Sequence, residues 1–319
     1  MKRIAVLTSG GDASGMNAAI RSVVRYAIYH KIEVMGVFRG YWGLINEELK
    51  LLDHRSVSNI INRGGTILKT ARCPEFTTAE GQRRAVENIK KYGIEGLVLI
   101  GGNGTYQGGI ALTRKWNIPC IGVPATIDND INGTDFTIGA DTAVNTALEA
   151  IDKIRDTATS LERIFVVEVM GRDSGFIALQ VAIGGGAEDV LLPEKDFDFE
   201  EMCHEIVEGN LRGKVSWIII TAEGKARGED VARKINDITG LETRVVVLGH
   251  IQRGGSPTAI DRIIATRLGA EAVDLLIKGE SGKAVGITSS QVTTVDLEFA
   301  VTKKEFKYNV LYQLIKILT

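Results

Sequence analysis

The chain has 319 residues, of which 44% are hydrophobic and 24% are charged, and its formal net charge at pH 7 is −2. This near-neutral charge argues against a protein that binds nucleic acid or a membrane surface, because both classes usually carry a basic excess. No apolar run approaches the roughly 18 residues of a membrane span. The start of the chain is typical of a strand and loop rather than a signal peptide, and its three scattered cysteines are typical of reduced thiols, so we expect a cytoplasmic protein.

Short apolar strands alternate with amphipathic helices along the chain. We predict strands over residues 3–8, 32–38, 96–101, 120–124, 163–169, 215–221 and 243–249. Helices are predicted over residues 16–30, 78–93, 141–160 and 261–279. This alternation is typical of an α/β fold, in which helices cover both faces of a parallel sheet.

Two of the predicted strands end in similar glycine-rich loops. LTSGGDASG (7–15) and LIGGNGTYQGG (99–109) both run from a strand through two glycines and an Asp or Asn into a helix. Unpaired N–H groups at such a helix start can bind phosphate, whereas a single loop of this kind is more often a plain turn. The pair therefore indicates a nucleotide or phosphate site. Neither loop has the lysine of a P-loop, and the second misses the dinucleotide fingerprint by one residue, which leaves an NAD-dependent oxidoreductase as the weaker alternative.

An acidic loop follows the predicted strand 120–124. The segment VPATIDNDINGTDFT (123–137) brings Thr126, Asp128 and Asp130 to the carboxyl end of that strand. One carboxylate of this group can accept a proton from a substrate hydroxyl while another holds a metal ion. The alternative is an ordinary polar turn, which Asn and Asp also favour.

Several loops that we expect at strand ends carry an arginine: Arg63, Arg72, Arg172 and Arg253. Guanidinium groups bind phosphate through two parallel hydrogen bonds and keep their charge, so we interpret these residues as phosphate ligands. His250 and Glu223 add groups that can bind sugar hydroxyls. Together the residues predict phosphoryl transfer from a nucleotide to a phosphorylated, hydroxyl-rich acceptor.

The motifs resemble those of the bacterial 6-phosphofructokinase family, from residue 1 to about residue 290. The segments that carry the resemblance include LTSGGDASGMNAAIR, NRGGT, ARCPEF, TIDNDI, VEVMGR, AEG and HIQRGGSPTA. The resemblance implies a phosphofructokinase-like α/β fold with two similar three-layer domains, each a mainly parallel sheet with helices on both faces. It implies a larger ATP-binding domain, 1–138 plus 252–304, and a smaller sugar-phosphate-binding domain, 139–251 plus 305–319. It also implies a homotetramer.

The resemblance further implies that ATP, with Mg²⁺ as cofactor, phosphorylates the 1-hydroxyl of fructose 6-phosphate to give the 1,6-bisphosphate and ADP. The implied catalytic residues are Asp128 as base, Thr126 beside it and Arg172 on the transferring phosphate. The implied ATP site comprises Gly11, Tyr41, Arg72, Cys73, Gly102, Asn103, Gly104 and Thr105. The implied sugar-phosphate site adds Arg163, Met170, Gly171, Glu223, Arg244, His250 and Arg253, with Arg163 and Arg244 reaching it from a neighbouring subunit. An allosteric site for ADP or phosphoenolpyruvate would use Arg21, Arg25, Arg155, Gly186, Glu188, Arg212 and Lys214.

The chain also departs from the family pattern. Asn103 stands where the family has the aspartate that is associated with magnesium, and Asp130 is a further candidate ligand. Because an amide brings no charge, we expect weaker metal positioning and a rate loss on the order of 10²–10³. Gly104 and Ala125 differ from the Asp and Lys of pyrophosphate-using relatives, which favours ATP as the donor. Ala125 also replaces the usual glycine, and Phe176 stands where an aspartate is common in the family. The changes at 103, 125 and 176 keep an alternative open, a catalytically impaired paralogue or variant that binds nucleotide and sugar phosphate as a regulatory protein.

Overall fold

The computed structural model describes residues 1–306 and 308–318, and the chain divides into two compact units. Unit 1 comprises Met1–Thr142 and Arg253–Lys304, and unit 2 comprises Ala143–Gln252 and Glu305–Thr319. The chain therefore crosses between the units after residues 142, 252 and 304, whereas the family resemblance implies crossings after 138, 251 and 304. None of the described helices is both long and apolar enough to cross a membrane.

Unit 1 is built on a seven-stranded sheet with the order β11-β10-β5-β4-β1-β2-β3. Its strands are β1 (Arg3–Thr8), β2 (Glu33–Val37), β3 (Leu49–Leu52), β4 (Leu97–Gly101), β5 (Cys120–Pro124), β10 (Lys283–Thr288) and β11 (Gln291–Asp296). The five inner strands are parallel, which confirms the prediction of a mainly parallel sheet, although β10 is not among the predicted strands. The edge strands β3 and β11, which the sequence analysis does not predict, are antiparallel to their neighbours. Ser289 and Ser290, both at positive φ, close a two-residue hairpin before β11, and a serine pair is a weak sequence signal for such a turn.

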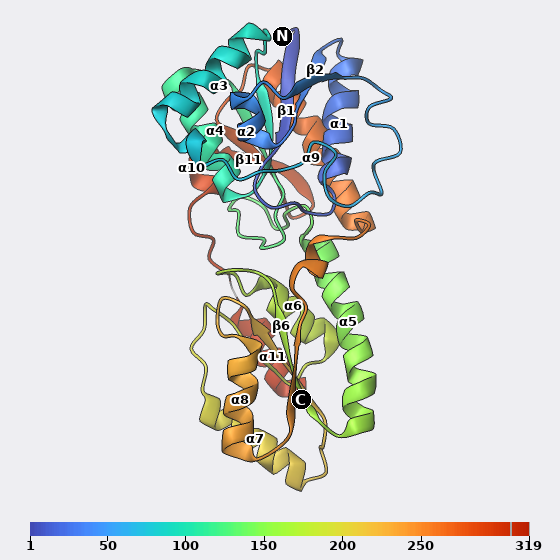
Figure 1. The fold of residues 1–319 in the computed structure, drawn as a ribbon. Helices are drawn as coiled ribbons and strands as arrows, with labels where there is room; N and C mark the ends of the chain where they lie inside the picture. The colour runs from blue at the N-terminus through green and yellow to red at the C-terminus, as the bar shows by residue number, and fades with distance from the viewer. Residues whose placement is uncertain (307, 319) are drawn as a thin grey trace. The chain divides into compact units, whose positions relative to one another are not determined.

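Helices cover both faces of this sheet. They are α1 (Met16–Tyr29), α2 (Gly40–Ile45), η1 (Pro74–Thr77), α3 (Ala79–Lys91), α4 (Asn103–Trp116), α9 (Ala259–Ile277) and α10 (Leu297–Ala300). On one face, Leu7 and Leu99 pack with Tyr106 of α4 in a buried cluster. On the other, α1 and α9 lie side by side, and a Cβ at Gly269 would come within 2.8 Å of the Ala19 carbonyl oxygen (Figure 1). Glycine therefore permits the close approach of these two helices.

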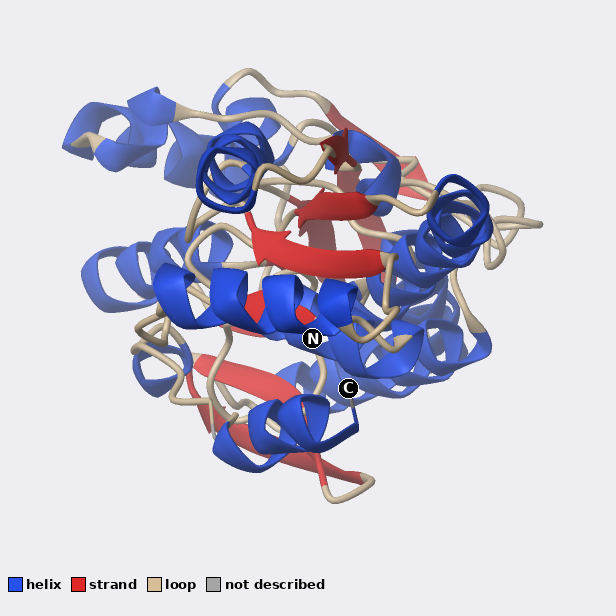
Figure 2. Cartoon of the chain, turned by 90° about the horizontal axis from the view of Figure 1, so that it is seen from below, coloured by secondary structure: helices blue, strands red, loops and turns tan. Residues whose placement is uncertain are grey.

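Unit 2 contains a smaller sheet with the order β7-β8-β6-β9, in which all neighbours are parallel. Its strands are β6 (Ile164–Val169), β7 (Asp189–Leu191), β8 (Trp217–Ala222) and β9 (Thr243–Val247). The helices are α5 (Ala140–Leu161), α6 (Phe176–Gly185), α7 (Phe199–Leu211), α8 (Gly228–Thr239) and α11 (Asn309–Leu318), with the short η2 (Gly249–Arg253). Val166 and Ile219 pack against Ile206 of α7 and Val231 of α8. Helices flank the strands here as well (Figure 2), so both sheets have the α/β architecture that the sequence predicts.

Candidate active site

Three loops begin at the same edge of the sheet in unit 1. Strand β4 pairs in parallel with β1 on one side and with β5 on the other. Because parallel neighbours end at the same edge, the glycine loop after β1, the start of α4 and the acidic loop after β5 all begin there. The prediction that the two glycine loops follow neighbouring strands is confirmed.

The helix that follows β4 begins in an open position. Gly102 is the N-cap of α4 and offers no side-chain cap to the first N–H groups. A Cβ on Gly104 would meet no atom of the described chain within 4 Å. The Thr105 hydroxyl donates to the Ser9 carbonyl at 3.0 Å, which ties this helix start to the loop after β1. An anion can therefore approach the unpaired N–H groups at the helix start.

Asn103 is bonded to the acidic loop. Its Nδ2 donates to Oδ2 of Asp130 at 2.7 Å. Its Oδ1 is buried and accepts no hydrogen bond from any described residue. No group of three or more His, Cys, Asp or Glu side chains in the described part of the chain could hold a metal ion. Magnesium is usually held by one or two carboxylates together with water and phosphate oxygens, so the Asn103 oxygen and the Asp130 carboxylate fit a site that is completed by a nucleotide.

The acidic loop is folded around a buried asparagine. Asn129 has a φ of 51°, its Oδ1 accepts from the Thr137 N–H at 3.0 Å, and its Nδ2 donates to the Asp135 carbonyl at 2.9 Å. Beside it, Asp128 is 5% exposed. Lys304 donates to the Asn129 carbonyl at 3.0 Å, and burial lowers the pKa of Lys304 to about 8. These contacts fix the backbone that directly follows Asp128.

Sequence reasoning missed Lys304 as a support for this loop. It lies far along the chain, in the part where the motifs match loosely, and its only sequence signal is a positive charge near the end of unit 1.

Arg253 lies against the first glycine loop. Its Nη1 donates to the Asp12 carbonyl at 3.2 Å, and a Cβ on Gly11 would come within 2.5 Å of the same nitrogen. The absence of a side chain at Gly11 therefore leaves the room that the guanidinium occupies.

The segment before α3 differs from the prediction. Arg63 and Arg72 lie in the long connection between β3 and η1, so the expectation that they sit at strand ends is wrong. Arg72 is exposed, and Cys73 is half-buried. Tyr41 is buried, its ring stacks on Phe76 with centroids 4.0 Å apart, and its hydroxyl donates to the Thr105 carbonyl. The tyrosine thus supports the start of α4.

In unit 2, the residues after β6 and β8 form a second cluster. These strands are neighbours, and Met170, Gly171 and Arg172 follow the first while Glu223 follows the second. Oε1 of Glu223 accepts from the N–H groups of Gly171 and Arg172 at 3.2 and 2.9 Å. The Arg172 side chain is exposed. His250 is exposed in η2.

Two arginines of unit 2 share one carboxylate. Nε of Arg163, on the residue before β6, donates to Oε2 of Glu242 at 2.8 Å, and the Arg244 guanidinium pairs with Oε1 of the same residue. The Arg163 and Arg244 side chains are 30% and 55% exposed. Glu242 was not predicted from the sequence, because a charged residue before a strand looks like ordinary surface.

The residues expected to bind an effector belong to both units. Arg21 and Arg25 lie on α1 of unit 1, where burial and the charge of Arg25 lower the pKa of Arg21. In unit 2, the Glu188 carboxylate lies 3.9 Å from Arg155 and 3.5 Å from Lys214. Arg212, the remaining charged residue of this set, pairs with Glu208.

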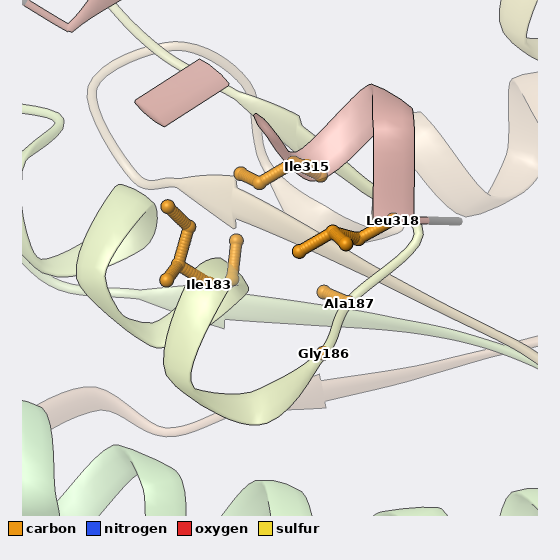
Figure 3. Close-up of a pocket in the computed structure, with 6 residues that line it drawn as sticks. Ile183, Gly186, Ala187, Ile315 and Leu318 are labelled. Atoms are coloured by element: carbon orange, nitrogen blue, oxygen red, sulfur yellow. The ribbon is translucent and has the colours of Figure 1, made fainter. Parts of the chain in front are cut away.

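Gly186 caps α6 with a φ of 61° and lines an apolar pocket of about 50 Å³. Ile183 of α6 and Ile315 and Leu318 of α11 point toward one another across this pocket (Figure 3). Its lining carries no charged side chain among the described residues, so the pocket does not extend the cluster of charges around Glu188.

Comparison with known proteins gives consistent matches over the whole chain. The model of the family described as phosphofructokinase matches residues 3–276. An ATP-dependent 6-phosphofructokinase of Bacillus subtilis is 57% identical over 320 residues, and one of Bacillus velezensis is 56% identical over 319, each match covering 100% of both chains. The structure of phosphofructokinase from Saccharomyces cerevisiae is similar with a TM-score of 0.89 and 36% identity. That match covers 94% of this chain and 45% of the yeast chain, so this chain spans a little under half of the yeast protein.

Proposed function

Because the chain belongs to the phosphofructokinase family, we propose that it is an ATP-dependent 6-phosphofructokinase that phosphorylates the 1-hydroxyl of fructose 6-phosphate. The observation that carries the proposal is the meeting of the α4 start and the acidic loop at one edge of the sheet in unit 1. This edge offers N–H groups for phosphates and a carboxylate for a hydroxyl proton, which are the two things that phosphoryl transfer needs from a protein.

In the proposed mechanism, Asp128 accepts the proton of the 1-hydroxyl as that oxygen attacks the γ-phosphorus of ATP. The new bond joins the sugar oxygen to phosphorus, and the bond to the β,γ-bridging oxygen breaks, so that ADP leaves. The start of α4 holds nucleotide phosphates, and Arg172 neutralises charge on the transferring group. Support for the role of Asp128 comes from its burial and from the fixed loop around it, since a rigid base loses no activity to reorientation.

Magnesium is part of the proposal. When bound with the nucleotide, it neutralises charge on the phosphates. Asn103 and Asp130 would hold it, because the amide oxygen has no other partner among the described residues and the carboxylate is bonded to the same amide. The amide brings no charge, so we propose that the chain needs a higher magnesium concentration than a chain with a carboxylate at this position.

We propose the same division of labour between the units that the sequence suggested. Unit 1, with the loops after β1, β4 and β5, binds ATP, and unit 2, with the turn after β6 and with Glu223, binds the sugar phosphate. The proposal also includes a homotetramer and an effector site for ADP or phosphoenolpyruvate that uses Arg155, Glu188 and Lys214. The paired charges around the Glu188 carboxylate support that site, because they would bind the charged groups of such an effector.

A magnesium titration tests the function and the role of Asn103 together. Fructose 1,6-bisphosphate is measured from ATP and fructose 6-phosphate for the wild type and for Asn103→Asp. We expect the wild type to turn over, and we expect the variant to be faster by on the order of 10²–10³ at limiting magnesium, because a carboxylate adds charge at the metal. Asn117→Asp changes an exposed residue at the other end of α4 and is the matched control. It should change neither the rate of turnover nor its dependence on the magnesium concentration.

Other outcomes separate the alternatives. Turnover that is equal in the wild type and in Asn103→Asp at every magnesium concentration would show that the amide costs nothing. Absence of product in both, together with calorimetric binding of ATP and fructose 6-phosphate, would replace the kinase with a protein that only binds these ligands.

A further inference from the structure

Three consecutive backbone N–H groups in unit 2 are all bound by side chains. Glu223 accepts from Gly171 and Arg172, as described above, and Oε1 of Gln252 accepts from the N–H of Met170 at 2.9 Å. The two acceptors come from different parts of unit 2, Glu223 from the end of β8 and Gln252 from η2. We call residues 170–172 the sugar turn, because the proposed function places the sugar phosphate on them.

The sugar turn has a backbone conformation that must be held in place. Gly171 has a φ of 146° and Arg172 a φ of 52°, the second in the left-handed region that an arginine rarely adopts. A Cβ on Gly224 would come within 1.7 Å of the Arg172 carbonyl oxygen, so the turn lies directly on the backbone of the Glu223 loop. The conformation therefore depends on its hydrogen-bond partners and on this close contact.

Gln252 is suited to hold the turn and is not well satisfied otherwise. Its side chain is 1% exposed. Because the Met170 N–H can only donate, the amide oxygen must face it, and the amide nitrogen is then left buried with no acceptor in the described chain. An apolar side chain of the same length would avoid that unpaired donor but would leave the Met170 N–H unpaired instead. What the glutamine contributes at this position is its oxygen.

We propose that Gln252 is a positioning residue for the sugar phosphate, acting through the Met170 N–H to keep the sugar turn in the conformation that directs Arg172. The inference rests on the proposed function, because it takes the sugar turn as the place where fructose 6-phosphate binds. Gln252 itself does not touch the substrate.

The test is Gln252→Met, which keeps the length of the side chain and removes the acceptor. We expect the KM for fructose 6-phosphate to rise about tenfold, the effect of losing one hydrogen bond of ordinary strength. The kcat should fall as well, because Arg172 is displaced, while the KM for ATP stays unchanged. Gln252→Glu keeps an oxygen at the same distance and should restore most of the affinity for the sugar phosphate. Calorimetry of fructose 6-phosphate binding reports the same change without requiring turnover.

Gln82→Met is the matched control. Gln82 is also buried, but it lies in unit 1 and bonds the Phe76 carbonyl and the Trp116 indole. If Gln82→Met raises the KM for fructose 6-phosphate as much as Gln252→Met does, the effect is general destabilisation and the inference is overturned. It is also overturned if Gln252→Met leaves that KM unchanged, or if Gln252→Glu, once shown to be folded, loses as much affinity as Gln252→Met. If Gln252→Met does not fold, Gln252→Asn, one methylene too short to reach Met170, takes its place with the same expectation.

The inference and the proposed function fail in different ways. A wild type that makes no fructose 1,6-bisphosphate contradicts the function. A wild type that makes it, with a Gln252→Met variant of unchanged sugar affinity, contradicts only the role of Gln252.

Discussion

Tyr41 joins two parts of unit 1 through one ring and one hydroxyl. The ring stacks on Phe76 of η1 with an interplanar angle of 14°, and the hydroxyl donates to the Thr105 carbonyl in the first turn of α4. Burial raises the pKa of Tyr41 well above its usual value, so the hydroxyl keeps its proton and remains a donor. The residue therefore supports the start of α4, where we place the nucleotide phosphates.

Tyr41→Phe should weaken this support while keeping the stacked ring. The loss of a hydrogen bond to a buried carbonyl costs about 1 kcal/mol of unfolding free energy, and the looser helix start should raise the KM for ATP severalfold. Urea unfolding and steady-state kinetics measure the two effects. Tyr29→Phe, at a tyrosine that is 80% exposed, is the control and should change neither the free energy of unfolding nor the KM for ATP. An unchanged KM for ATP in Tyr41→Phe would separate the tyrosine from nucleotide binding.

Single residues show what the sequence could predict at the site and what it could not. The sequence identifies Asn103 as the unusual residue of its loop, because an amide stands there in a recognisable motif where the family has an aspartate. Its bond to Asp130 could not be foreseen, since it depends on the path of a different loop. The contacts of Lys304 and Gln252 carry no local signal for the same reason, although Gln252 lies inside the quoted motif HIQRGGSPTA. Each acts on backbone groups far away in the chain, and no local pattern records such a partner.

Among the elements, the beginnings of α5 and α9 are fastened together by a buried carboxylate. Asp261 of α9 is fully buried, its Oδ1 accepts from the Gly139 N–H at 2.8 Å, and its Oδ2 accepts from the N–H and the hydroxyl of Thr142 at 2.8 and 2.5 Å. Burial raises the pKa of Asp261 to about 6, and the negative charge of Asp141 adds to the rise. The N–H groups at the start of α5 thus find their acceptor on another helix.

This pKa gives a pH dependence of stability with a definite sign. The folded-state pKa of Asp261 lies above the usual value of 3.8 for an aspartate, so the folded protein binds the proton more tightly than the unfolded chain does. The contribution of Asp261 is therefore fully present below about pH 4 and is lost as the pH rises through about 6, a change on the order of 3 kcal/mol. Relative to Asp261→Asn, the wild type should lose about this much unfolding free energy between pH 4 and pH 7, as measured by urea unfolding.

The control for this measurement is Asp237→Asn, at an exposed aspartate of α8. The difference between that variant and the wild type should stay constant over the same range of pH. A constant difference for Asp261→Asn as well would mean that the buried carboxyl ionises as it does in the unfolded chain.

The inner strands and the longer helices could be predicted because their patterns are local. Continuous apolar runs identified β1, β4 and β5, and helical periodicity identified α1 and α9, to within two residues at each end. The sequence analysis did not predict the short edge strands β3 and β11, because half-exposed segments of four to six residues carry little apolar pattern. Their antiparallel pairing depends on the neighbouring strand, which the sequence of the segment itself does not specify.

On the scale of the whole molecule, the division of labour between the units predicts which amides each ligand protects. Magnesium-ATP alone should slow hydrogen exchange in residues 101–106, at the end of β4 and the start of α4. Fructose 6-phosphate alone should slow it in residues 168–174, around the sugar turn, because a bound ligand suppresses local opening. Exchange measured by mass spectrometry on the intact chain distinguishes the two patterns. Protection of residues 168–174 by magnesium-ATP alone, to the same degree, would contradict the assignment of nucleotide to unit 1 and sugar phosphate to unit 2.

The three chain crossings also set the order in which the two sheets can be completed on the ribosome. The four strands of unit 2 all lie before residue 248, so its sheet can close while later residues are still being made. The larger sheet starts first and finishes last, because β5 has no neighbour on one side until β10 emerges. The helix α1 likewise lacks the helix that packs beside it until α9 emerges. From residue 125 to residue 282 the nascent chain carries an open sheet edge, the kind of surface that pairs wrongly with other chains. The helix α1, which is among the first segments to be translated, is thus among the last to be covered by its neighbours.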